Sequence, residues 1–418
     1  MLNSVGIFFL TLLSLGISLD ILLTLLNLNH IKKGAGNLPK VFQKTIDRET
    51  YQKIISYNAY SDRFGLIETG FSFLLLLYFV YFGGFKFIDG FARGIESGGY
   101  YLSALVFLGI IYLIKLGLGI PFELYNTFVI EERYGFNKTV LPLFWLDLIK
   151  SLLVDTIIGV PLFMAILWFM DKAGSCWWIW AWIFFTIIQL LVIIIYPAWI
   201  APLFNKFTPL KEGELKDGIT AFSREVDFPL SGIYTMDGSK RSGHSNAYFT
   251  GLGRKKRIML LDTLVEQLRI PHVLAILVHE FGHHKLHHVK KNLIIHLLLS
   301  LGGFYLLSLL VKSEIFYSGM GFSHPSNYAA LVVFGLLVSA LSFLFTPFFS
   351  MLSRQFEYSA DRFALKLIDS PETMAEVIAI LSKENLINLN PHPWYSFFHY
   401  SHPAPVERVE AIYDSSRD

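Results

Sequence analysis

The chain has little charge and almost no cysteine for its length. Charged residues make up 16% of its 418 residues, and Cys176 is its one cysteine, whereas a soluble protein carries about 25% charged residues. One cysteine excludes an intrachain disulfide and a zinc centre built from several thiolates. The net charge of +2 gives no reason to expect a nucleic-acid partner. Any zinc must therefore be held by histidine and carboxylate side chains.

What the chain has instead is long apolar runs. Hydrophobic residues make up 53% of it, and a helix needs about 20 such residues to cross a bilayer. The first run follows Met1 without a basic region or a cleavage site, so we interpret it as a retained span. The sequence predicts a mainly α, polytopic membrane protein with seven spans, approximately at 4–27, 66–86, 101–124, 148–170, 177–200, 291–311 and 327–350.

Basic residues are unevenly divided between the predicted loops. The loop between the first two spans carries seven of them: Lys32, Lys33, Lys40, Lys44, Arg48, Lys53 and Arg63. The 201–290 segment is also basic, whereas the opposite side is nearly free of Lys and Arg. Because basic loops stay in the cytoplasm, we expect the N-terminus outside and 201–290 and 351–418 in the cytosol.

The motif His279-Glu280-Phe281-Gly282-His283 lies in an apolar context typical of a helix. Histidines four residues apart stand on one face, one turn apart, and can bind a single Zn²⁺. The glutamate between them can take a proton from a water that the metal activates. The motif predicts a zinc hydrolase whose site faces the cytosol.

Two histidines do not complete a catalytic zinc site, because three protein ligands and one open position are needed. Glu357 is a candidate third ligand, and Asp361 follows it by one helical turn. Asp361 can accept the second N–H of a ligand histidine and so fix its tautomer. H-E-x-x-H followed by E-x-x-x-D is the gluzincin arrangement.

The 201–290 segment reads as a compact α+β unit. An amphipathic helix is predicted over 211–228, with strands at 233–236, 246–250 and 258–261 before the motif helix. We divide the chain into a transmembrane region, 1–200, and a zinc metalloprotease region, 201–418, which includes the last two spans.

Several motifs together resemble the type I CAAX prenyl endopeptidases, which are integral-membrane gluzincins. The resemblance covers nearly the full length and rests on 131–137, 202–210, 244–251, 279–283, 353–361 and 401–403. It implies seven spans around a large water-filled chamber and cleavage of the last three residues from a prenylated C-a-a-X sequence. A chamber would also explain the ionisable residues in or beside the spans, although placement at the interface explains several equally well; these residues are Asp20, Glu68, Lys115, Glu123, Asp147, Lys150 and Asp155.

The resemblance also implies roles for individual residues. His279, His283 and Glu357 would bind one Zn²⁺ per chain, and Glu280 would be the general base. His402 is the candidate donor to the oxyanion, with Arg408 bracing its segment.

A substrate peptide needs a surface on which to extend. The predicted strand that contains Asn246, Ala247, Tyr248 and Phe249 is expected to be an edge strand that pairs with the substrate backbone. Asn246 would fix the peptide near the scissile bond.

Other functions remain open at this point. A broad-specificity quality-control protease of the membrane would share the zinc motif, and a zinc transporter would use histidines and intramembrane acids. We expect a monomer in a lipid bilayer that acts on a peptide or protein substrate, with or without a prenyl group on a C-terminal Cys. A prokaryotic inner membrane is favoured, or the endoplasmic reticulum if the source is eukaryotic.

Overall fold

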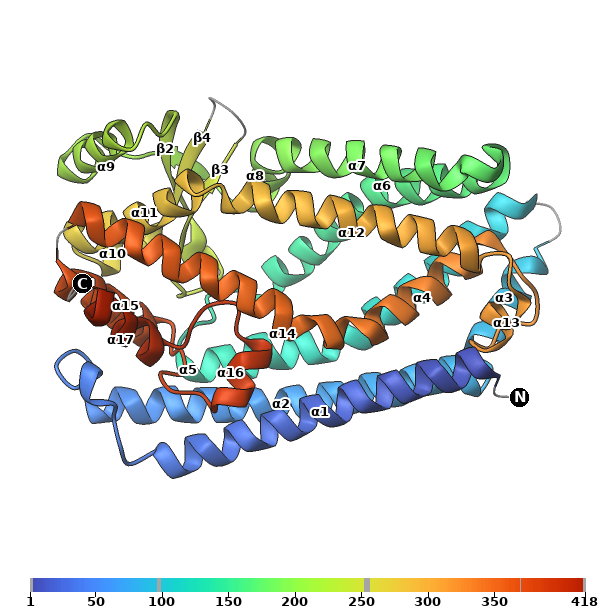
Figure 1. The fold of residues 1–418 in the computed structure, drawn as a ribbon, viewed down its shortest axis with the longest axis horizontal. Helices are drawn as coiled ribbons and strands as arrows, with labels where there is room; N and C mark the ends of the chain where they lie inside the picture. The colour runs from blue at the N-terminus through green and yellow to red at the C-terminus, as the bar shows by residue number, and fades with distance from the viewer. Residues whose placement is uncertain (1–2, 96–98, 252–255, 369, 416–418) are drawn as a thin grey trace.

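The computed structural model describes residues 3–95, 99–251, 256–368 and 370–415. Within these ranges seven helices are long and apolar enough to cross a membrane, as the sequence predicts. They are α1 (Ser4–Gly34), α2 (Arg48–Tyr81), α4 (Gly99–Tyr125), α6 (Leu141–Lys172), α7 (Trp177–Ile195), α12 (His288–Leu310) and α14 (Asn327–Ile368). Short helices at the end near the N-terminus are α3 (Gly84–Arg93) and α13 (Glu314–Ser318) (Figure 1).

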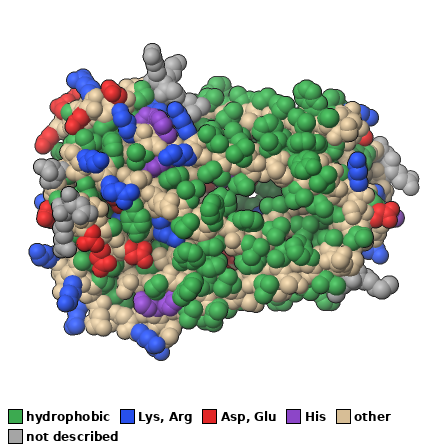
Figure 2. Space-filling view, viewed as in Figure 1, with side chains coloured by type: hydrophobic (Ala, Val, Ile, Leu, Met, Phe, Trp, Pro, Cys, Tyr) green, Lys and Arg blue, Asp and Glu red, His purple; other side chains and the backbone are tan. Residues whose placement is uncertain are grey.

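The spans enclose a hollow rather than a packed core. In α2, α12 and the spans that begin at Gly99 and Gly174, only 6% of the residues in the most apolar 18-residue stretch are buried. A helix in a tight bundle would instead bury one whole face. Two separate hydrophobic cores hold the ends together, one around Phe107 and Tyr328, the other around Ile258 and Val278. Figure 2 shows a band of hydrophobic side chains that is hollowed near its centre, with most of the charge gathered at one end.

Several of the ionisable residues in the spans have polar surroundings. Glu68, Lys115 and Glu123 line a cavity of about 570 Å³. Asp147 pairs with Arg241 at 2.7 Å, and Asp155 accepts a hydrogen bond from the Tyr112 hydroxyl at 2.8 Å. Because a charged group is costly in hydrocarbon, a hollow interior accommodates Glu68, Lys115 and Glu123, whereas Asp147 is accommodated by its ion pair.

The α+β unit holds a four-stranded sheet in the order β1–β2–β4–β3. Its strands are β1 (Phe207–Pro209), β2 (Leu230–Met236), β3 (Ala247–Thr250) and β4 (Lys256–Leu261). The sequence predicted the last three strands but not β1, because three residues are too few for a periodic pattern. Nearby helices are α5 (Glu132–Tyr134), α8 (Ala201–Phe204), α9 (Glu214–Glu225), α10 (Asp262–Gln267), α11 (Ile270–Lys285), α15 (Pro371–Glu384), α16 (Pro393–His399) and α17 (Pro405–Ser415).

The seventh span differs from the expectation. We predicted that it ends near residue 350 and that Glu357 and Asp361 lie on a separate soluble segment. Instead α14 is one helix of 42 residues, about 63 Å long and twice the thickness of the hydrocarbon. Pro347 lies within it without ending it. The candidate third ligand is therefore carried by the extension of a membrane helix.

Candidate active site

The motif helix α11 begins at Ile270, with Pro271 in its first turn, where a missing N–H costs nothing. Its inner face packs closely on α14. A Cβ atom added to Gly282 would lie 3.1 Å from both Cα and the carbonyl oxygen of Ala360. Glycine at this position allows the two backbones to approach, and this approach brings the motif histidines to Glu357.

The three predicted ligands lie together. Nε2 of His283 is 3.1 Å from Nε2 of His279 and 3.2 Å from Oε1 of Glu357, and Nε2 of His279 is 3.3 Å from Oε2 of Glu357. Ligands at about 2.0–2.2 Å from a tetrahedral zinc stand about 3.3–3.6 Å apart. Oε2 of Glu357 is buried and accepts no hydrogen bond from any residue that the structure describes. This group of donors fits one small divalent cation.

Asp361 and Arg408 support the first of these histidines. Nδ1 of His279 lies 2.8 Å from Oδ1 of Asp361, so the ring can donate its other N–H there and leave Nε2 for a metal. Nη2 of Arg408 also lies 3.3 Å from this Nε2. Arg408 donates two hydrogen bonds to the same carboxylate, at 2.6 and 2.7 Å.

The charges around His279 decide its protonation before a metal binds. Burial and the Arg408 guanidinium favour the neutral ring, but Asp361 and Glu357 outweigh them and raise the pKa of His279 to about 9. A metal ligand must be a neutral imidazole, so metal binding at neutral pH would release this proton.

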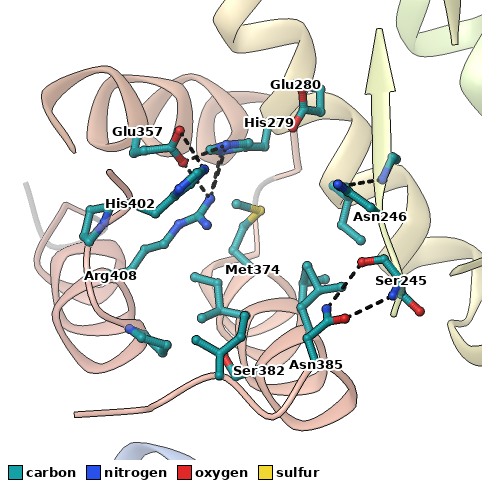
Figure 3. A pocket seen from close by; sticks show the side chains of 18 of the residues that line it. Ser245, Asn246, His279, Glu280, Glu357, Met374, Ser382, Asn385, His402 and Arg408 are labelled. Atoms are coloured by element: carbon teal, nitrogen blue, oxygen red, sulfur yellow. Dashed lines mark hydrogen bonds and ion pairs between the residues drawn. The ribbon is translucent and has the colours of Figure 1, made fainter. Parts of the chain in front are cut away.

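The ligands open onto a pocket of about 600 Å³ between α11, α14, α15, β3 and the segment before α17. Figure 3 shows His402 and Arg408 on the side of Glu357, with Glu280 above them and Asn246 across the pocket. Nε2 of His402 is 3.4 Å from Oε1 of Glu357, and 67% of the His402 side chain is exposed. An imidazole here can donate an N–H to a group that reaches the ligands.

Strand β3 lies at the edge of the sheet. The Leu261 amide donates to the carbonyl of Asn246 at 3.1 Å, and in an antiparallel ladder such contacts alternate. The backbone groups of Ala247 and Phe249 therefore face away from β4, and those of Phe249 and the carbonyl of Ala247 are placed to pair with an added strand. The Asn246 side chain accepts from the Ala247 amide at 2.8 Å.

The four predicted substrate-binding residues do not present their side chains alike. Asn246 and Ala247 line the pocket. The ring of Phe249 instead stacks on Phe281, with centroids 5.2 Å apart, and the Tyr248 hydroxyl lies 3.6 Å from the sulfur of Met236. Phe249 can therefore offer its backbone to a peptide but not its ring.

A polar network that we did not predict fixes the approach to β3. His244 contacts Oε2 of Glu131 at 3.1 Å and Oδ1 of Asn385 at 3.0 Å, and the Ser245 amide donates to the same Oδ1. The hydroxyl of Tyr57 on α2 donates to Glu131 at 2.7 Å. Glu131 and His244 stand in two motifs that carried the family resemblance, which was the available signal. Asn385 lies in no such motif.

Comparisons with known proteins find matches over nearly the whole chain. Residues 27–206 match the family model for the five membrane helices of the CAAX prenyl protease N-terminal region, and residues 209–416 match peptidase family M48. The human CAAX prenyl protease 1 homolog is 34% identical over 92% of this chain and 90% of its own length. The Saccharomyces cerevisiae CAAX prenyl protease 1 is also 34% identical, over 90% and 88%. The crystal structure of S. mikatae Ste24p matches with a TM-score of 0.90 at 32% identity and covers 98% of this chain and 99% of that one.

Proposed function

This chain belongs to the CAAX prenyl protease branch of peptidase family M48 and is a multi-pass membrane metallopeptidase; from that premise we propose that it removes the C-terminal tripeptide from prenylated C-a-a-X peptides. The observation that carries the proposal is the triangle of His279, His283 and Glu357, which opens onto a pocket beside the edge strand β3.

The metal would be zinc, one ion per chain, and His279, His283 and Glu357 would hold it. When bound, zinc polarises a carbonyl and lowers the pKa of a water molecule towards neutrality. Glu280 lines the same pocket; it takes the proton of the attacking water and then delivers it to the leaving amine. His402 donates an N–H to the oxyanion that develops on the scissile carbonyl, and Arg408 holds Asp361 in place behind His279.

The peptide extends along the outer edge of β3 and pairs with the backbone of Ala247 and Phe249. Antiparallel pairing directs the C-terminal end of the substrate towards Asn246 and Ser245. The amide of Asn246 holds the peptide near the bond to be cut.

The prenyl chain enters a second, more apolar cavity of about 990 Å³ between α7, α12 and α14. Ser401, next to His402, lines both this cavity and the pocket of the metal ligands. Most of the other lining side chains are apolar, among them Leu299, Phe334 and Phe345. A lipid attached near the scissile bond can therefore lie at membrane depth while the peptide stays at the sheet.

Filling this cavity is expected to weaken binding of the lipid. Gly302 lines the cavity, and a Cβ atom there would meet nothing within 4 Å. The Gly302→Trp variant should raise KM for a farnesylated peptide by about 10-fold, since overpacking an apolar site costs about 1–3 kcal/mol. KM for the unprenylated peptide should change little in the same steady-state assay.

Gly335 gives the matched control. It is also exposed on an apolar span with nothing within 4 Å of an added Cβ, but it does not line the cavity. Gly335→Trp should leave both KM values unchanged. An equal rise for the two peptides in Gly302→Trp would refute a lipid site at this place.

The function itself is tested with a farnesylated C-a-a-X peptide and its unprenylated twin. The zinc-loaded enzyme should release the tripeptide from the farnesylated peptide with a kcat/KM at least about 10-fold higher, because burial of the prenyl chain favours binding. Mass spectrometry identifies the bond that is cut.

The outcomes separate the alternatives. Equal cleavage of both peptides would favour a broad-specificity quality-control protease. Cleavage of neither, with zinc bound, would overturn the CAAX assignment, and zinc flux into vesicles would then favour a transporter.

The two regions of the chain, its orientation and its membrane are part of the same proposal. We propose that region 1–200 forms the membrane entry to the site, that region 201–418 performs the chemistry, and that the active site faces the cytosol, because the basic loops lie on that side. We expect a monomer. The relatives named above are eukaryotic, so they lend no support to a prokaryotic source; for a eukaryotic source we propose the endoplasmic reticulum membrane.

A further inference from the structure

His288 touches His283, the second of the proposed metal ligands. It is the first residue of α12 and is only 3% exposed. Nδ1 of His288 lies 3.1 Å from Nδ1 of His283. His283 turns its other nitrogen, Nε2, to His279 and Glu357, so the contact with His288 is on the side of the ring that faces away from the ligands.

The hydrogen-bond partners define the direction of each bond in this contact. With Nε2 of His283 committed to the metal, its Nδ1 carries the proton and donates it to Nδ1 of His288. His288 then carries its own proton on Nε2, which lies 3.2 Å from Oγ of Ser359. The Ser359 hydroxyl donates in turn to the carbonyl of Phe356 at 2.8 Å. In this series of hydrogen bonds every donor has one acceptor, and no two donors face each other.

Packing fixes the plane of the His288 ring. It stacks on Phe356, with centroids 4.2 Å apart and planes 8° from parallel. Lys291 places its ammonium 5.6 Å from the centre of the same Phe356 ring. A neutral ring is what the contact requires, since only neutral imidazole has an accepting nitrogen.

We propose that His288 is a positioning residue for the metal ligand His283. It accepts the Nδ1 proton of His283, fixes the tautomer that presents Nε2 to the metal, and holds the ring in register with Glu357. Asp361 performs the same task for His279, but with a charged carboxylate. Because His288 begins α12 while Phe356 and Ser359 lie on α14, the metal site is braced by both of the last two spans.

The inference rests on His283 being a metal ligand, as proposed above, and it is tested by zinc affinity without any peptide. His288→Leu keeps an apolar side chain against Phe356 but removes the acceptor. Loss of such a supporting hydrogen bond lowers metal affinity by about 10–100-fold. His288→Asn places Oδ1 where Nδ1 stood, so it should restore most of the affinity. Chelator competition on the full-length protein measures both.

A matched control variant and a spectroscopic measurement distinguish a positioning role of His288 from general destabilisation of the fold. His287 is the exposed neighbour with φ = 60°, a conformation that asparagine tolerates, so His287→Asn should leave the affinity unchanged. In the Co²⁺-loaded protein, His288→Leu should alter the visible absorption bands and His288→Asn should not.

Two results would overturn the proposal. One is a folded His288→Leu variant with zinc affinity within about twofold of the wild type. Should that variant fail to fold, Ser359→Ala is the substitute, since it removes only the acceptor for Nε2 of His288 and should weaken zinc binding several-fold; unchanged affinity there is the second contrary result. A wild-type protein that binds no zinc at all would instead overturn the proposed function.

Discussion

Replacement of Glu280 by glutamine is expected to abolish peptide cleavage while the protein keeps its zinc. Glu280 lines the pocket beside His279 and Glu357 but does not belong to the group of ligand atoms. Glutamine keeps the size of the side chain and loses the ability to accept a proton. A general base contributes about 10²–10⁴-fold to the rate, so single-turnover cleavage of the farnesylated peptide should fall by about that factor or more. Zinc content is measured on the same preparation by elemental analysis.

Glu266 gives the control for this experiment. It is an exposed carboxylate on the neighbouring helix α10, so Glu266→Gln should cleave as the wild type does. A Glu280→Gln enzyme of full activity would remove Glu280 from the chemistry. Loss of zinc in that variant would show that Glu280 acts on the metal site rather than on the proton.

Replacement of Glu357 by glutamine is expected to remove zinc binding. Both carboxylate oxygens of Glu357 lie 3.2–3.3 Å from the nitrogens of the two histidines, and the neutral amide is a far poorer ligand for a dication. Zinc affinity should therefore fall by more than the roughly 100-fold that loss of a supporting hydrogen bond can cost. Arg408 keeps its two hydrogen bonds to Asp361, so the metal-free variant should still fold.

The measurement is thermal unfolding with and without zinc. A ligand that binds only the folded state stabilises it in proportion to its affinity, so zinc should raise the Tm of the wild type and leave that of Glu357→Gln unchanged. Glu410→Gln, which changes an exposed residue of α17, should respond to zinc like the wild type. A full zinc-dependent rise in Glu357→Gln would exclude Glu357 as a ligand.

Local sequence patterns predicted most of the elements of this fold. Apolar runs of about 20 residues predicted the seven spans, because the bilayer requires that length of any helix that crosses it. The spacing of His279 and His283 followed from the pitch of a helix. Short runs of strand-forming residues next to turn signals predicted three strands, whereas β1 has only three residues.

Local patterns did not predict where a long helix ends or which side chains meet across a turn. We expected Glu357 on a soluble segment, since hydropathy falls after residue 350, but hydrogen bonding within the helix continues through the interface and extends α14 to Ile368. The contact between His283 and His288 was also missed. Five residues apart is not a helical neighbour relation, and the turn at His287 with φ = 60° is what brings the two rings together.

The sequence by itself determined that this is a seven-span membrane protein with a gluzincin motif, because hydropathy and helical periodicity depend only on residues close along the chain. Only the tertiary structure decided that the spans enclose a hollow, that β3 is an edge strand, and that Asp361, Arg408 and His288 surround the proposed ligands. Each of these depends on which distant surfaces pack together, and the close approach of α11 and α14 at Gly282 is a contact of that kind.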